Sequence, residues 1–484
     1  MTDLAYFPDA PESTPGLLVS VQAIPTTRGY GGAPSAVSAG FAALAAACTG
    51  AALLARLDGT VRQIAGTQTK LYEGSGGVWT DVSRVGNYVT GDVKWRFAQF
   101  GNTTLAISKA IQLQFSNSGA FANVSNSPKA ALMESVGPFI ILANCDDTGT
   151  GLATGFGDQP NRWWTSPSFA PTTSWTPATS TSCASGLLVS APGEITALKR
   201  LGDTCIAFKD RAMYVGQLTG GPDVIRWDLV PGEIGTANNE AVVSIGPLLY
   251  FIGSDDIYSF DGSRPVSVGQ GIKETFFAEL NKAYAYKIEG QHDFQKQCIW
   301  WHFPSGSSTT LNDVIVFNYV TGKWGRTLLD VECAVPAVTS QITFDTLGNF
   351  FATFDDLPAT AYDSPFWQAG APVMSVIDTT HTLQTLTGAS SNFRVKTGYV
   401  GDDQQVSTCI RVLPRWGIKP LTATITPRTV MALGDTEVTG STWPINGNRF
   451  DVLQSARYHG FEIACTGEVE LQLLTPTLVG DGDE

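Results

Sequence analysis

Short apolar segments separated by tight turns recur along most of this 484-residue chain, and segment 247–280 shows the pattern most clearly. Leu248–Ile252 and Ile257–Phe260 are rich in aromatic and β-branched residues, and turn-forming residues lie between them at 253–256. An Asp-Gly pair at 261–262 follows the second segment. Two strands joined by a tight turn, with a second turn after them, predict an antiparallel meander.

Composition supports strands rather than helices over the rest of the chain. Gly (50 residues) and Pro (26 residues) are plentiful, and only 15% of the residues are charged. This profile is typical of many short strands joined by turns. Since 484 residues are too many for one ordinary domain, we expect two or three domains or one large all-β unit.

Groups of four predicted strands recur roughly every 40 to 55 residues between residues 50 and 380. We count about six groups, and seven is also possible. A four-stranded sheet cannot bury both of its faces alone, so such sheets stack around a channel. The sequence therefore predicts an all-β fold with a β-propeller over residues 41–386. A run of β-sandwich modules is the alternative, since the Trp-Asp and double-glycine signatures of known propeller repeats are absent.

The two ends of the chain differ from this repeating part. Residues 1–40 lack strong periodicity, and we expect an arm that docks on a platform or on a partner subunit. Residues 387–392 read as a linker, and alternating segments after it predict a C-terminal antiparallel β-sandwich over 387–484. One helix is expected over Lys273–Tyr286, inserted between two strand groups, because Phe276, Phe277, Leu280 and Tyr284 have helical spacing. We expect this insertion to contact neighbouring subunits or a channel.

Charge and hydrophobicity exclude several classes of protein. The net charge of −14 argues against a protein that grips nucleic acid by its phosphates. The acidic, Pro-rich first residues do not resemble a signal peptide. Residues 36–57 are mostly small and are interrupted by Thr49 and Gly50, so no membrane-spanning segment is expected.

Candidate metal ligands and nucleophiles are dispersed. The eight cysteines occur singly, without metal-binding spacing, and are interpreted as reduced buried thiols. The spacing allows His292 and His302 to face each other across a hairpin, but the remaining histidines, His381 and His459, lie far away in sequence. We therefore assign no metal-binding and no cofactor-binding residue.

Aspartate pairs are the strongest candidates for catalytic carboxylates. A glycosidase needs two carboxylates that converge on one bond, and sequence spacing does not show convergence. Most of these pairs fall between predicted strands, where Asp stabilises turns. The Gly269–Gly271 segment lacks the remainder of a phosphate-binding loop and is interpreted as the turn before the helix. We assign no catalytic residue and expect no enzyme activity. The pairs are Asp146-Asp147, Asp255-Asp256, Asp355-Asp356 and Asp402-Asp403.

Several short phrases resemble one family. The segment 57–72 (LDGTVRQIAGTQTKLY) resembles the opening hairpins of tail nozzle, or tail-hub, proteins of short-tailed bacteriophages. Segments 251–262 (FIGSDDIYSFDG) and 314–324 (VIVFNYVTGKW) resemble its propeller blades, and 456–463 (ARYHGFEI) resembles its C-terminal β-domain. The resemblance lies in strand pattern and short phrases across most of the chain, and no single motif is diagnostic.

That resemblance implies a structural protein of the virion tail, made in the host bacterial cytoplasm. It implies a propeller with a platform formed from the chain ends, assembled as a homo-hexameric tube under the tail adaptor ring. Tail fibre or needle proteins would be further partners. Such a tube retains packaged double-stranded DNA and lets it pass during genome ejection without sequence-specific binding. An acidic channel would help the DNA slide, because Lys and Arg would hold its phosphates.

Two other functions remain open at this point. A carbohydrate-binding or glycoside-hydrolysing propeller would use Trp163-Trp164, Trp300-Trp301 and the aspartate pairs to line a sugar site. A protein-interaction propeller would be a monomer that never forms rings.

Overall fold

The computed structural model describes residues 4–89, 94–220, 223–338, 372–390 and 392–480, and these form two compact units. Strands make up 53% of the structure and helices 3%, so the predicted all-β class is confirmed. The first unit contains described residues of 1–36, 267–330 and 387–484, and the second contains those of 37–266 and 331–386. The predicted division into 1–40, 41–386 and 387–484 stays a prediction.

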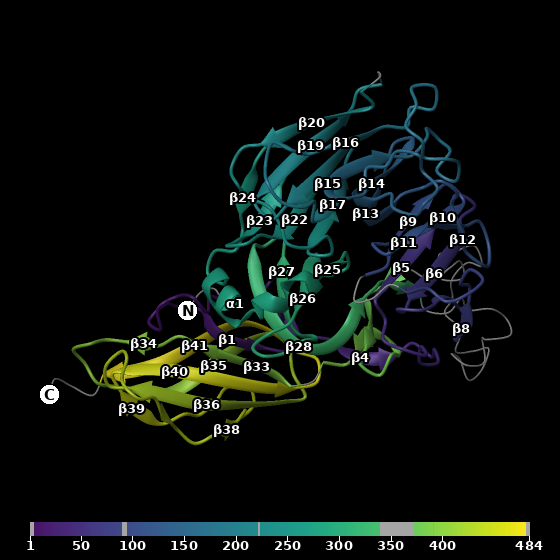
Figure 1. Cartoon of the computed structure of the whole chain (residues 1–484). Helices are drawn as coiled ribbons and strands as arrows, with labels where there is room; N and C mark the ends of the chain where they lie inside the picture. Colours follow the sequence, from purple (N-terminus) through teal and green to yellow (C-terminus); the bar gives the residue numbers. More distant parts are fainter. Residues whose placement is uncertain (1–3, 90–93, 221–222, 339–371, 391, 481–484) are drawn as a thin grey trace. The chain divides into compact units, whose positions relative to one another are not determined.

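Five four-stranded antiparallel meanders, each formed by consecutive strands, fill most of the described part of the second unit (Figure 1). The second and third join into one eight-stranded sheet through the pairing of Gln112 with Lys129. The meanders are β5 (Gly50–Ala55), β6 (Val61–Gly66), β7 (Leu71–Ser75) and β8 (Val78–Asp81); β9 (Arg96–Phe100), β10 (Thr103–Ser108), β11 (Ile111–Ser116) and β12 (Ala122–Asn123); β13 (Lys129–Val136), β14 (Phe139–Asp146), β15 (Asp158–Thr165) and β16 (Ser185–Leu187); β17 (Ala197–Leu201), β18 (Thr204–Lys209), β19 (Ala212–Leu218) and β20 (Ile225–Val230); and β21 (Val242–Ile245), β22 (Leu248–Ile252), β23 (Ile257–Phe260) and β24 (Pro265–Ser267).

Local turn chemistry sets these hairpins. In the β5–β6 turn the Asp58 carboxylate accepts hydrogen bonds from the Thr60 N–H (2.9 Å) and hydroxyl (2.6 Å). Gly59 between them has a φ of +83°, a left-handed conformation that favours glycine. The predicted hairpin at 248–260 is confirmed, since β22 pairs with β23 in antiparallel register.

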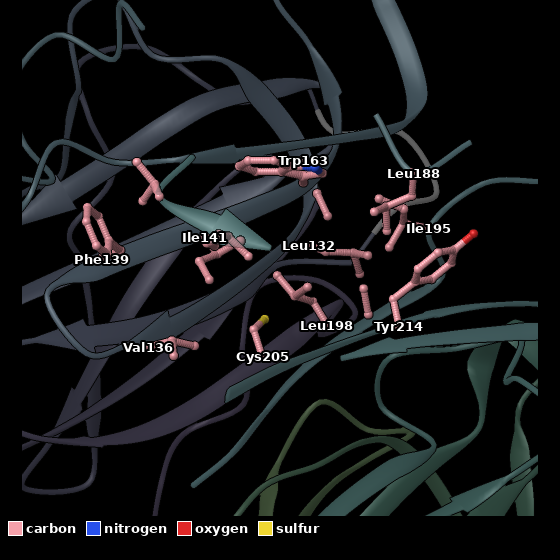
Figure 2. Packing of buried hydrophobic residues seen from close by; sticks show 14 of the residues in the cluster. Leu132, Val136, Phe139, Ile141, Trp163, Leu188, Ile195, Leu198, Cys205 and Tyr214 are labelled. Carbon is pink, nitrogen blue, oxygen red and sulfur yellow. The ribbon is translucent and has the colours of Figure 1, made fainter. Parts of the chain in front are cut away.

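Hydrophobic cores connect successive meanders. Figure 2 shows Leu132 and Ile141 of the third meander packed in one cluster with Leu198 and Tyr214 of the fourth. A second cluster joins the fourth meander to the fifth, and two more join the first three in order. Each of the first four meanders therefore buries apolar side chains against the next meander along the chain, as a sheet with apolar residues on both faces must.

The first unit contains a sixth consecutive meander, which is part of a twelve-stranded sheet together with strands from both chain ends, and a separate seven-stranded sheet built from the chain ends. The strands β4, β24, β28 and β32 contribute residues to both units. The sixth meander is β25 (Glu289–Asp293), β26 (Cys298–Phe303), β27 (Leu311–Asn318) and β28 (Lys323–Ala334). The N-terminal strands are β1 (Leu17–Val21), β2 (Ala23–Pro25), β3 (Tyr30–Gly32) and β4 (Ser35–Ser38). Shorter strands after β28 are β29 (Ala337–Val338), β30 (Pro372–Val373), β31 (Ser375–Asp378) and β32 (Leu383–Gly388). The C-terminal strands are β33 (Phe393–Thr397), β34 (Val400–Gly401), β35 (Ser407–Ile418), β36 (Thr422–Val430), β37 (Val438–Thr439), β38 (Trp443–Pro444), β39 (Gln454–Ala456), β40 (Tyr458–Thr466) and β41 (Glu470–Gly480).

Strands from the two ends of the chain pair directly with each other. β1 pairs with β33 in one sheet, and β3 pairs with β41 in another. In Figure 1 the purple N-terminal segment accordingly runs beside the yellow-green C-terminal strands. The described N-terminal residues up to 36 are therefore part of a folded sheet structure in which both chain ends are held.

The predicted helix over Lys273–Tyr286 is wrong in extent. The chain forms α1 over Lys273–Glu279, between β24 and β25 in sequence, and then a separate 3₁₀ helix over Lys282–Lys287. Asn281 separates them because its backbone is extended and its side chain accepts a hydrogen bond from the Ala283 N–H. Asn competes for backbone hydrogen bonds and is therefore favoured at helix ends rather than inside helices.

Across the described ranges, no helix has the length and apolar character needed to cross a membrane.

Candidate functional site

The aspartate pairs that the structure describes lie in turns or, for Asp146-Asp147, at the end of strand β14. Asp255 and Asp256 lie between β22 and β23, where Asp255 accepts a hydrogen bond from the Tyr258 hydroxyl at 3.0 Å. Asp403 accepts one from the Tyr458 hydroxyl at 2.6 Å, in the first unit. Asp355-Asp356 lies outside the described residues. Within the second unit, Asp146-Asp147 and Asp255-Asp256 belong to hairpins of different sheets, and neither pair is shown to share a site with a second carboxylate pair, as glycoside hydrolysis would require.

Asp147 shows how one of these carboxylates is used. It is 5% exposed and accepts hydrogen bonds from the Thr154 hydroxyl at 2.5 Å, the Phe156 N–H at 2.8 Å and the Gly157 N–H at 2.6 Å. Burial by itself raises the pKa of Asp147, but these donors outweigh burial and lower the pKa below its usual value. A carboxylate held in this way organises its loop and has little capacity left for a metal or substrate.

The histidines are not brought together. In the β25–β26 hairpin His292 pairs with Ile299, whereas His302 pairs with Glu289. Residues directly opposite share a face and adjacent positions alternate, so His292 and His302 point to opposite faces of the sheet. The facing arrangement that the spacing allowed is therefore not the one that the hairpin adopts.

The remaining two histidines have local partners. His381 lies 2.8 Å from a Glu332 carboxylate oxygen, and His459 contacts the Ser407 hydroxyl at 3.1 Å. All eight cysteines are buried, and none of them forms a disulfide. Within the described part of the chain, no group of three or more His, Cys, Asp or Glu side chains is arranged to hold a metal ion.

The tryptophan pairs have different environments. Trp164, Trp300 and Trp301 are at most 1% exposed and belong to sheet cores. Trp163, at 8% exposure, packs against the cluster in Figure 2 and also lines a cavity. Adjacent residues on a strand point to opposite faces, and this is why Trp163 and Trp164 have separate roles.

The cavity beside Trp163 has a volume of about 520 Å³ and lies within the second unit. It opens between β15 and β16 on one side and the β19–β20 hairpin on the other. Its lining contains one aromatic ring, two hydroxyls, one carboxylate, one guanidinium and two apolar side chains. The residues are Trp163, Ser185, Thr219, Asp223, Arg226, Ala184 and Ile225.

Glycines opposite two tryptophans set the position of the Trp163 ring. Gly186 pairs with Trp163, and a Cβ at Gly186 would lie 2.8 Å from the Trp163 ring. Gly216 pairs with Trp227, and a Cβ there would lie 2.7 Å from that ring. The Trp163 and Trp227 indoles thus each lie over the backbone of a glycine on the neighbouring strand. The centroids of the two rings are 6.0 Å apart.

The polar groups of this cavity differ in how far they are already engaged. The Thr219 hydroxyl donates to the Asp223 carbonyl, and the Ser185 hydroxyl donates to the Trp163 carbonyl. Arg226 is 69% exposed and donates to Asp228 at 2.9 Å. Among the described residues, neither the Trp163 indole N–H nor the Asp223 carboxylate has a hydrogen-bond partner. The cavity therefore offers an indole donor and a carboxylate acceptor to a ligand, with the Asp228-paired guanidinium of Arg226 beside them.

A second cavity, of about 910 Å³, lies in the first unit beside α1. Asp9 on its wall accepts hydrogen bonds from the Glu274 N–H at 2.9 Å and the Thr275 N–H at 2.8 Å. The Gly269–Gly271 segment forms the turn before α1, as the sequence predicted. In this turn the Ile272 and Lys273 N–H groups donate hydrogen bonds to the Gly269 carbonyl. Asp9, which lines this second cavity, thus caps the N-terminal end of α1.

Sequence reasoning singled out Trp163 but not Thr219, Asp223 or Arg226. These residues come from separate strands and loops, and their types are common on any surface. No signal in the local sequence pattern links them, because the packing of one meander on the next brings them together.

No protein-family model matches the chain, and no curated protein matches it in sequence.

Proposed function

We propose that this protein is a structural component of a virus particle: the tail nozzle of a short-tailed bacteriophage, without catalytic activity. In this proposal the consecutive four-stranded meanders are blades of a β-propeller. The sheets built from both chain ends are the platform, and six copies form a tube through which double-stranded DNA is retained and ejected. The tube binds the tail adaptor ring and tail fibre or needle proteins.

The pairing of the two chain ends is the observation that carries the proposal. A platform made from chain ends is what the resemblance to tail nozzle proteins implies. The partners in the β1–β33 pair include Ser20 and Val395, and the β3–β41 pair joins Tyr30 to Leu471. Ser20, Tyr30, Val395 and Leu471 are all at most 1% exposed, so these pairings are part of a buried core. A firmly closed platform suits a protein that transmits load between neighbours in a ring.

The meander series supports the propeller. Six four-stranded antiparallel meanders follow one another between β5 and β28, and hydrophobic clusters join successive meanders in the second unit. This is the organisation of repeat architectures in which each sheet buries its faces only against its neighbours.

Charge supports a role in passing DNA rather than binding it. The net charge of −14 argues against a protein that holds nucleic acid by its phosphates. Many of the cations in the described sheets are also engaged by carboxylates, including Arg62 with Glu73 and Arg96 with Glu240. The acidic body is therefore compatible with DNA that slides and does not stick.

Oligomeric state tests the proposal first. The recombinant full-length chain is analysed by native mass spectrometry and by electron microscopy of negatively stained particles, alone and with the adaptor-ring protein of the encoding phage. The proposal expects six-fold rings under at least one of these conditions. A chain that stays monomeric in both conditions contradicts the hexameric tube and favours the protein-interaction propeller.

Location in the virion tests the proposal independently. An antibody against the recombinant chain is applied to purified virions of the encoding phage and visualised with gold particles in the electron microscope. Label at the distal end of the tail is expected. Label confined to the capsid, or absent from intact virions, overturns the assignment to the tail.

A further inference from the structure

We propose that the cavity between β15–β16 and the β19–β20 hairpin is a binding site for a short neutral saccharide. This inference does not depend on the tail-nozzle assignment, because it rests on the chemistry of one cavity inside the second unit. The site consists of Trp163, Asp223 and Arg226, with Ser185 and Thr219 beside them.

Its size suits a small ligand. Cavities that hold small molecules typically measure about 300–1,000 Å³, and this one measures about 520 Å³. Trp163 in its wall is held by the core cluster and by the close approach of Gly186, so the ring is rigid before any ligand arrives. A preorganised aromatic surface binds at a smaller entropic cost than a mobile one.

The available polar groups point to a ligand with both donors and acceptors. The Trp163 indole N–H donates only, the Asp223 carboxylate accepts only, and the Arg226 guanidinium donates only. Hydroxyl groups serve all three, because each hydroxyl both donates and accepts. The apolar C–H face of a sugar ring matches the Trp163 ring and the Ile225 side chain beside it.

Simple ions fit this cavity poorly. A divalent cation prefers several oxygen ligands, and Asp223 supplies the only carboxylate of the lining. An anion would face that same carboxylate, and Arg226 is already paired with Asp228. Because Asp228 already neutralises Arg226, the single Asp223 carboxylate repels anions and supplies too few ligands for a divalent cation, so a neutral polyhydroxylated ligand is the class that suits this lining.

Three variants test the site in the full-length protein. Asp223→Ala and Arg226→Ala remove exposed side chains and leave the sheets intact. Trp163→Phe keeps an aromatic ring in the core but removes the N–H donor. Matched controls are Asp203→Ala and Arg200→Ala, since this exposed Asp/Arg pair lies in the β17–β18 hairpin of the same four-stranded sheet.

Binding is measured on an array that carries bacterial surface polysaccharides together with maltose, cellobiose, lactose and diacetylchitobiose. Any disaccharide that binds is then titrated against the soluble protein by tryptophan fluorescence. We expect binding to at least one neutral glycan, and an affinity about tenfold or more weaker in each site variant. The two control variants should bind as the unaltered protein does.

Three outcomes overturn the proposal. The unaltered protein binds no neutral glycan, the three site variants bind as well as the unaltered protein, or the control variants lose binding to the same degree. Circular dichroism of every variant shows whether the sheets remain folded. Loss of binding in an unfolded variant is not counted, and the remaining two site variants then decide. None of these outcomes affects the ring-symmetry test of the proposed function.

Discussion

Arg326 is a residue whose replacement should be costly, because it compensates a carboxylate that is almost fully buried. Asp313 on β27 is 1% exposed, and its carboxylate accepts hydrogen bonds from Arg326 on β28, with the Nε–Oδ1 distance at 3.0 Å. Arg326 also lies 2.6 Å from Glu279 at the end of α1. Burial alone lowers the pKa of Arg326, but the two carboxylates outweigh it and raise the pKa above its usual value.

Replacing Arg326 with Met leaves the Asp313 charge buried without its partner. Removal of one member of a buried ion pair costs about 3–5 kcal/mol. The lower end applies here, because Arg326 is 22% exposed and the Val314 N–H still donates to Asp313 at 2.9 Å. We expect a loss of about 3 kcal/mol in the free energy of unfolding of the first unit, which is on the order of a hundredfold in its folding equilibrium.

The measurement is native-state hydrogen exchange of β26, β27 and β28 by mass spectrometry, supported by urea denaturation followed by tryptophan fluorescence. Hydrogen exchange measures the free energy of opening of these strands separately from the rest of the chain. This is needed because a chain with two units does not have a single two-state free energy of unfolding. Arg449→Met is the matched control, because Arg449 lies in the same unit and pairs with Asp451 at 2.7 Å on the surface, with both side chains about half exposed. We expect the control to lose less than about 1 kcal/mol.

A compensating double variant separates the buried charge from simple loss of packing. Asp313→Asn combined with Arg326→Met removes both charges and keeps an acceptor for the Val314 N–H. We expect it to recover most of the stability, since replacing both members of a buried pair is often nearly neutral. The reasoning is refuted if Arg326→Met loses less than about 1 kcal/mol, or if the double variant is no more stable than the single one.

Three further predictions follow from single sites. Burial lowers the pKa of His302 to about 4, so the folded state binds fewer protons than the unfolded state between that value and about 6.5. Its contribution to stability is therefore complete above pH 6.5 and is lost as the pH falls through about 4, by up to about 3 kcal/mol, and His302→Leu should flatten this slope in urea midpoints measured from pH 7 to pH 4. Asp9→Ala removes the acceptor of two N–H groups of α1 and should cost about 1 kcal/mol, seen as faster hydrogen exchange in α1. Gly66→Ala places a Cβ 2.4 Å from the Trp95 ring and should cost about 1–3 kcal/mol in the urea midpoint.

Each of these three predictions has a contrary result. An unchanged pH slope in His302→Leu means that the buried imidazole does not govern acid stability. Unchanged exchange in α1 of Asp9→Ala means that the helix does not need its distant cap. A neutral Gly66→Ala means that the Trp95 ring moves aside without cost.

The meanders were predictable because hairpin formation is a local matter. The alternation of apolar strands and Gly or Asp turns at 248–262 contains all the residues that form β22, β23 and their turn. The extent of the helix was harder to predict, since Phe276 and Tyr284 keep helical spacing across Asn281, where the backbone is extended. Hydrophobic periodicity indicates which side chains face the core. A break such as Asn281 between two short helices does not change that periodicity, so the sequence pattern did not reveal the break.

The strand register decided to which face of the sheet each histidine and tryptophan side chain points. His292 and His302 flank a hairpin in sequence, and the observed register places them on opposite faces of the sheet. A shift of one residue would have reversed this result, and sequence spacing does not determine such a shift. For the same reason adjacent tryptophans separated, with Trp164 in a core and Trp163 beside a cavity.

By itself, the sequence determined the all-β class, the order of the hairpins and the absence of a local catalytic motif, because each depends on residues close together in the chain. Only the tertiary structure decided that β1 pairs with β33 and β3 with β41. It also decided that Asp223 and Arg226 share a cavity with Trp163. A strand offers the same row of N–H and C=O groups to any partner, so the packing of the whole chain selects which distant strands meet.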